Sequence, residues 1–153
     1  MIDRQKVDVS PGRIHRVYLS ALMLVIGLFL FHTLLLFEVA ESLIQLKAWL
    51  GEHLGPHRVG RTIVLTSFVV LFIAHIVEAA TYGLFLRCNR LVPSFSEGLY
   101  FASATITALG YGDVVLPPPW RQLGPLVTIA GLLKFGCSTA FLFVIMQAVW
   151  GSQ

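Results

Sequence analysis

Three long apolar stretches dominate the chain, and they cover residues 17–37, 62–86 and 123–149. The first contains no formal charge, a histidine and a glutamate interrupt the second, and one lysine interrupts the third. An α-helix rises 1.5 Å per residue, so stretches of this length can cross the roughly 30 Å hydrocarbon core of a membrane. The pattern predicts three transmembrane helices.

The segment 38–55, between the first two stretches, has a different pattern. Apolar residues recur at every third or fourth position, at Val39, Leu43, Leu46, Leu50 and Leu54. This spacing forms one face of a helix and predicts an amphipathic connector. The connector either extends the first transmembrane helix or lies along the membrane surface, and Gly55 and Pro56 predict its end.

Composition agrees with a chain that resides in a lipid bilayer. Of its 153 residues, 56% are hydrophobic and only 12% are charged, far from the balance of a soluble domain. The net charge of +3 comes without a basic patch interleaved with aromatic residues, so no nucleic-acid partner is expected. No nucleophile–base set and no phosphate-binding glycine loop is recognisable, so we expect no enzyme and no cofactor.

Residues 1–16 form a polar segment with four basic residues. Basic residues before an apolar run also occur in secretory signals, but the run over 17–37 is too long for one and lacks a clean cleavage site. We therefore predict a first transmembrane helix that is retained. His53 and His57 have the i, i+4 spacing of a metal site, although Gly55 and Pro56 between them interrupt the helix.

Residues 105–113 read Thr-Ile-Thr-Ala-Leu-Gly-Tyr-Gly-Asp and carry the most informative chemistry. They overlap the end of a predicted short helix over 95–107 and precede the third apolar stretch. Consecutive carbonyls can all face one way only if alternate residues adopt conformations open mainly to glycine, which Gly110 and Gly112 permit. Carbonyl oxygens can replace the water shell of a cation, so this loop is expected to line an ion pathway.

This stretch resembles the filter of potassium channels, which usually reads Thr-Val-Gly-Tyr-Gly. Segments 94–107, 116–123 and 135–143 are likewise similar to small bacterial ion channel proteins, and the resemblance covers residues 62–149. It implies an outer helix over 62–86, a pore helix over 95–107, a filter over 108–112 and an inner helix over 123–149. The implied potassium-binding residues are Ala108, Leu109, Gly110, Tyr111 and Gly112, supported by Thr107 and Asp113.

Filters of this type are rings of four loops, and this chain has one loop and no internal repeat, so four chains are expected around one axis. The predicted fold is an all-α membrane protein with three transmembrane helices, a re-entrant pore helix and filter between the last two, and a homotetrameric pore. Its predicted domains are 1–16, 17–61 and 62–149. The expected location is the bacterial inner membrane, and potassium is the expected permeant ion.

Two positions depart from the usual filter. Ala108 stands where the family usually has threonine, so a ring of hydroxyl ligands is missing, and Leu109 replaces valine. Two alternatives therefore accompany the potassium channel. One is a weakly selective monovalent cation channel, and the other is a non-conducting membrane scaffold that keeps the pore-loop fold.

Orientation is left open by the basic residues. If the filter's Asp113 end lies outside, as the resemblance implies, three basic residues are cytoplasmic and seven are on the opposite side. The positive-inside rule prefers the reverse, so the side of the amino terminus stays undecided.

In the third stretch, Gly131, Phe135 and Gly136 match cavity or gating positions of related channels, although the glycines also suit simple helix packing. Lys134 is a cation in mid-membrane and needs a partner or water. Glu78 has nearly the same predicted depth, so we predict a buried charge pair, with His75 one turn away. The alternative is a lysine that faces the cavity.

Overall fold

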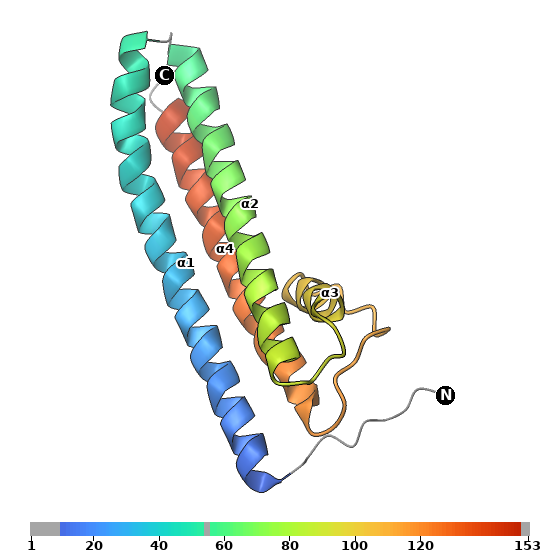
Figure 1. Cartoon of the computed structure of the whole chain (residues 1–153). Coiled ribbons are helices and arrows are strands. Elements are labelled where there is room, and N and C mark those ends of the chain that lie inside the picture. The colour runs from blue at the N-terminus through green and yellow to red at the C-terminus, as the bar shows by residue number, and fades with distance from the viewer. Residues whose placement is uncertain (1–9, 54–55, 151–153) are drawn as a thin grey trace. The chain divides into compact units, whose positions relative to one another are not determined.

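The computed structural model describes residues 10–53 and 56–150, and all of its regular elements are helices. They are α1 (Pro11–His53), α2 (Pro56–Cys88), α3 (Phe95–Ile106), the 3-10 helix η1 (Trp120–Gln122) and α4 (Leu123–Trp150). Figure 1 shows α1, α2 and α4 as long rods and α3 as a short helix in the connection between α2 and α4.

Three helical segments are long and apolar enough to cross a membrane. They are Pro11–Gly51, Arg58–Cys88 and Trp120–Trp150. The prediction of an all-α protein with three candidate membrane spans is thereby confirmed. The short segments 1–9 and 54–55 lie outside the described residues, as do the side chains of His53 and His57, so the histidine pair stays a prediction.

The helix α1 is longer than the first predicted span. It continues into the predicted connector without a break as far as His53 and has 43 residues. Ser10 precedes it, and Pro11 occupies its first position, where the missing N–H of proline costs no intrahelical hydrogen bond. The first apolar stretch and the amphipathic face therefore belong to one helix.

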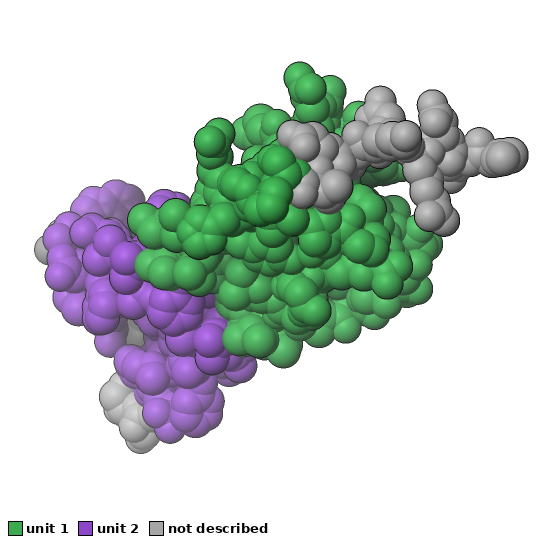
Figure 2. Space-filling view, turned by 90° about the horizontal axis from the view of Figure 1, so that it is seen from below, with its two compact units in different colours: residues 1–28, 77–132 green, residues 29–76, 133–153 purple. Residues whose placement is uncertain are grey.

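The described chain divides into two compact units, coloured separately in Figure 2. Unit 1 comprises residues 1–28 and 77–132, and unit 2 comprises residues 29–76 and 133–153. Helix α3 and the loop that follows it belong entirely to unit 1.

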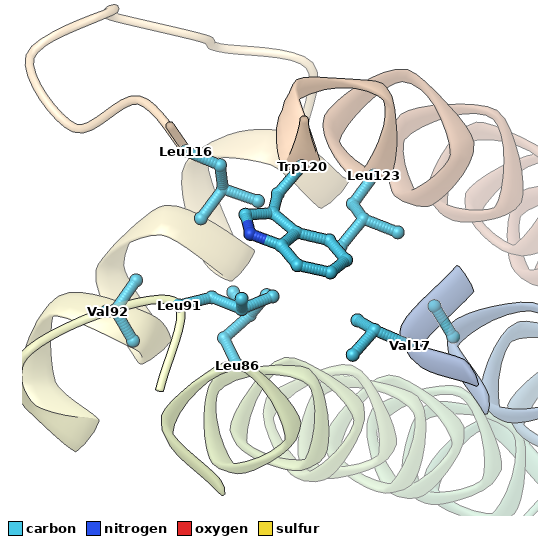
Figure 3. Close-up of a cluster of buried hydrophobic side chains, with 8 residues drawn as sticks. Val17, Leu86, Leu91, Val92, Leu116, Trp120 and Leu123 are labelled. Atoms are coloured by element: carbon cyan, nitrogen blue, oxygen red, sulfur yellow. The ribbon is translucent and has the colours of Figure 1, made fainter. Parts of the chain in front are cut away.

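The core of unit 1 is built around Trp120, whose side chain is completely buried (Figure 3). The other buried members are Val17, Ala21, Leu86, Leu91, Val92, Leu116 and Leu123. Tyr18 stacks on the indole with ring centroids 5.9 Å apart, and its hydroxyl donates to the carbonyl of Pro119 at 2.5 Å. This cluster joins the start of α1, the end of α2 and the start of α4.

Unit 2 has an aliphatic core. Its buried members are Val39, Leu43, Leu50, Val59 and Ile63, and side chains of α4 such as Phe141 and Val149 pack against them. The residues contributed by α1 include three of the predicted amphipathic face. That face is therefore used for packing within the protein.

Candidate functional site

Helix α3 has defined ends. Ser94 caps it, because its hydroxyl accepts a hydrogen bond from the backbone N–H of Glu97 at 3.1 Å. The helix has 12 residues, about 18 Å at 1.5 Å per residue, and is too short to cross a membrane. It ends at Ile106, directly before the glycine-containing loop.

Two glycines bring the backbones of α2 and α3 together. A Cβ atom on Gly83 would lie 2.7 Å from the backbone nitrogen of Leu99, and one on Gly98 would lie 2.5 Å from the carbonyl oxygen of Gly83. No side chain fits between these atoms. The start of α3 is therefore fixed to α2 at backbone distance.

The other end of α3 is fixed to α4 in the same way. A Cβ atom on Gly131 would lie 2.5 Å from the carbonyl oxygen of Ile106. One turn before Gly131, the Thr128 hydroxyl donates to the carbonyl of Thr105 at 3.1 Å. The last turn of α3, from which the loop departs, is thus held by direct contact with α4.

The loop alternates the sign of φ. Ala108, Gly110 and Gly112 have φ of 58°, 53° and 81°, whereas Leu109 and Tyr111 are not in the positive range. Gly110 and Gly112 have open space around the position of a Cβ, so their φ angles explain the choice of glycine. Ala108 adopts the same region with a side chain, at a cost of roughly 1–2 kcal/mol.

Two N–H groups of the loop donate hydrogen bonds back to α3. The N–H of Ala108 donates to Thr105 at 3.0 Å, and the N–H of Gly110 donates to Ala104 at 3.1 Å. Within the described part of the chain, no backbone hydrogen bond outside the helices ends on a carbonyl of residues 108–112. The loop therefore uses N–H groups for its attachment and keeps these carbonyls available.

Asp113 is attached to α3 through a side chain. The Tyr100 hydroxyl donates to its carboxylate at 2.7 Å, and this hydrogen bond lowers the pKa of Asp113 and raises the pKa of Tyr100. The second carboxylate oxygen accepts from the N–H of Val114 at 3.0 Å. Tyr100 is a candidate site residue that sequence reasoning missed. Its position shortly before the predicted filter, together with its hydroxyl group, could have indicated a hydrogen bond to the loop. Thr107 instead bonds its own helix, at the carbonyl of Ser103.

The loop is open on one side. Leu109 is 59% exposed and Tyr111 is 69% exposed. A hollow of about 500 Å³ extends from the loop to the start of α4, where Thr128 and Ile129 line it. A large aromatic side chain and a leucine are therefore uncovered in the single chain.

The predicted cavity or gating residues differ from one another. Gly131 is buried against α3, whereas Gly136 is exposed and has no atom within 4 Å of a Cβ position. Phe135, in unit 2, stacks on His75 with ring centroids 4.2 Å apart. Their role in a cavity or in gating stays a prediction.

The two predicted buried charges are indeed buried. Glu78 and Lys134 are both 0% exposed, and each takes part in an interaction. Glu78 belongs to unit 1 and Lys134 to unit 2. The pairing itself stays a prediction.

Unit 2 also contains a cluster of polar side chains that sequence reasoning missed, in which His32 and Ser138 are buried and His75 is half-buried. The Ser138 hydroxyl lies 2.9 Å from Nε2 of His32 and 3.2 Å from Nε2 of His75. The two rings have centroids 5.0 Å apart. One hydroxyl can donate to one ring and accept from the other, so it joins α1, α2 and α4. The three residues lie more than 30 positions apart in sequence, and no local pattern connects them.

The protein combines three long apolar helices with one short, capped helix. The short helix leads into a loop in which the sign of φ alternates. These are features of a membrane channel. Comparison with protein families agrees, because the model of a family described as "Ion channel" matches residues 62–149, more than half of the chain. The chain belongs to this family, which indicates a membrane-embedded ion channel rather than an enzyme. Comparisons with curated proteins and with solved structures give no match.

Proposed function

We propose that four copies of the chain form a channel that conducts potassium through a ring of backbone carbonyls at residues 108–112. The observation that carries this proposal is the alternation of φ at Ala108, Gly110 and Gly112. In a backbone that alternates between right- and left-handed conformations, carbonyls gather on one side and N–H groups on the other. Here the N–H groups of Ala108 and Gly110 bond to α3, which leaves the carbonyl side for an ion.

The chemistry of that side suits a monovalent cation. A carbonyl oxygen carries a partial negative charge and can replace a water molecule in the shell of potassium. The carboxyl end of α3, where the helix dipole is negative, lies directly before the loop and adds to the attraction. Lys134 is completely buried within its own chain, which supports a position away from the ion pathway.

A tetramer accounts for the open side of the loop. One loop supplies only one quarter of a ring of carbonyls, and the chain has no internal repeat that could supply the others. Neighbouring copies would also cover Tyr111 and Leu109, which the single chain leaves exposed. The hollow beside the loop is where we expect a neighbouring chain to pack.

Ion flux into liposomes tests the proposal. Purified protein should pass potassium several-fold faster than sodium under matched gradients and should contain four chains by mass measurement. Gly110→Ala and Gly112→Ala should abolish this preference, because each added methyl opposes the positive φ. Gly27→Ala is the matched control, since Gly27 lies in α1 with open space around it.

Three results would contradict the proposal. A two- or three-chain species with normal flux would exclude the four-fold ring. Unchanged potassium preference in both loop variants would exclude the filter. A folded tetramer without any flux would instead favour the non-conducting scaffold.

Ala108 favours a second candidate, a weakly selective cation channel, because it provides no hydroxyl at the first loop position. Ala108→Ser restores a hydroxyl without a branched Cβ, which the φ of 58° disfavours. We expect Ala108→Ser to raise the ratio of potassium to sodium flux modestly, and we expect Ala108→Cys, which adds one side-chain atom without a hydroxyl or a branched Cβ, not to do so. An equal ratio of potassium to sodium flux in the wild type and in both variants would show that the hydroxyl is irrelevant.

A further inference from the structure

A second polar hollow lies in unit 1, between the first turns of α1 and the carboxyl end of α2. It has a volume of about 500 Å³. Three arginines line it, Arg13 and Arg16 from α1 and Arg90 from the turn after α2. Among the described residues that line it, none is acidic. The described residues that line the hollow therefore carry positive charge and no negative charge.

Two features hold this group in place. The guanidinium of Arg13 donates to the carbonyl of Asn89 at 3.0 Å and so ties α1 to the end of α2. Arg90 is held by the cap of α2, in which the N–H of Leu91 bonds to the carbonyl of Leu86 at 2.9 Å. Both leucines are buried in the core around Trp120.

Arg90 adopts an unusual conformation for an arginine. Its φ is 56°, at the position just after a helix where glycine is strongly preferred. An arginine there is less stable than a glycine would be. Such a residue is a candidate for a role other than folding, because it is kept at a cost in stability.

The hollow lies at the level expected for lipid headgroups. It lies between the start of the candidate span Pro11–Gly51 and the end of the candidate span Arg58–Cys88. Val17, the first residue of the uncharged stretch, is buried and is the one large apolar residue among the described residues that line it. Tyr18 and Trp120 stack beside Val17 in the same core, and aromatic residues of this kind are enriched at the membrane interface.

We propose that this hollow binds the phosphate group of an acidic membrane lipid. Guanidinium groups match phosphate oxygens in charge and geometry, and basic pockets at the ends of membrane helices bind such headgroups. The apolar side chain of Val17 beside the arginines suits the start of an acyl chain. Free phosphate offers the same headgroup chemistry without that chain. The site is separate from the loop at residues 108–112, so the proposal does not depend on ion conduction.

Cys88 lines the hollow and is exposed, so it can report occupancy. In a Cys137→Ser background it is the sole cysteine, and its alkylation by a maleimide can be followed in nanodiscs of phosphatidylcholine. We expect added phosphatidylglycerol to slow the reaction in a saturable manner and inorganic phosphate to have no such effect. The quantity compared between variants is the phosphatidylglycerol concentration that gives half-maximal protection. The alkylation rate itself is not compared, because removing a charge near Cys88 also alters the intrinsic rate of that reaction.

Arg16→Gln and Arg90→Gln should each raise that concentration roughly fivefold, the usual effect of one basic residue near an acidic lipid. Arg87→Gln is the matched control, since Arg87 is exposed next to Cys88 but does not line the hollow, and it should change the value by less than about twofold. Arg90→Gly should weaken protection while raising the thermal stability, because glycine relieves the positive φ. That variant separates loss of the site from loss of folding.

Three outcomes would overturn the proposal. The first is equal protection by phosphatidylglycerol and by additional phosphatidylcholine. The second is an equal effect of Arg90→Gln and Arg87→Gln. The third is protection by inorganic phosphate as strong as that by the lipid, which would identify a free phosphate site in place of a lipid site.

Discussion

The two units pack their helices by different means. In unit 1, Gly83, Gly98 and Gly131 allow backbone atoms of α2, α3 and α4 to approach directly. In unit 2, the same long helices are separated by aliphatic side chains, with one hydroxyl between two histidines. Side chains change rotamer and tolerate small shifts, whereas a backbone contact permits almost none. The stricter packing occurs where α3 must aim the loop at residues 108–112.

The largest effect is expected from the buried charges, one in each unit. Glu78→Gln or Lys134→Met alone should cost about 3–5 kcal/mol, if each leaves the other charge uncompensated in a low-dielectric region. The double variant should cost less than the sum of the two. Thermal unfolding of the purified protein measures all three.

Additive losses would show that the residues do not pair and that each is compensated within its own unit. Raised conductance in Lys134→Met without loss of stability would instead place Lys134 at the ion pathway.

Glycine substitutions compare the packing of the two units directly. Gly83→Ala and Gly131→Ala place a methyl against backbone, so we expect losses near the upper end for overpacking, about 3 kcal/mol per chain. In unit 2, a Cβ on Gly60 would meet only the side chain of Val149. Gly60→Ala should cost about 1 kcal/mol or less.

Unfolding temperatures in detergent check this comparison. Adding Val149→Ala to Gly60→Ala removes the contacted Cγ1 atom and should relieve the overlap at Gly60. If Gly60→Ala is as damaging as Gly131→Ala, the proposed distinction between the units is wrong.

The polar cluster of unit 2 gives a smaller expected effect. Ser138→Ala removes the one hydroxyl that both His32 and His75 contact, and should cost about 1–3 kcal/mol. Thr139→Ala is the matched control, because its exposed hydroxyl bonds only the carbonyl of Phe135 in its own helix. Equal stability of the two variants would show that the cluster contributes nothing particular.

The smallest effect is expected at the exposed hydrogen bond between Tyr100 and Asp113. Tyr100→Phe should lower the ratio of potassium to sodium flux slightly at neutral pH, since the loop loses one attachment. The pKa of Asp113 is lowered, so the bond is present above about pH 4, the ordinary range of aspartate, and is lost as pH falls through the lowered value. Below about pH 4, the ratio of potassium to sodium flux should therefore fall in the wild type and stay constant in Tyr100→Phe. A similar fall in Tyr100→Phe would show that this hydrogen bond is not its cause.

The fold could be predicted largely from local pattern. Apolar runs of membrane length predicted the three long helices, and these appear as candidate spans. The short helix predicted over 95–107 appears as α3, and the glycines of the loop carried the signal for an unusual backbone. The continuity of α1 was one of two alternatives, because the same apolar face suits a helix on a membrane surface or one packed in a core.

What the sequence determined by itself was the membrane environment, the helical class and the family, since these depend on composition, length and a short contiguous motif. Tertiary structure decided which glycines contact backbone and which are open, so Gly131 and Gly136 look alike in sequence and differ in space. It also brought together Tyr100 with Asp113 and His32 with Ser138. Such pairs depend on the angles at which helices cross, and those angles result from packing over the whole unit rather than from any local pattern.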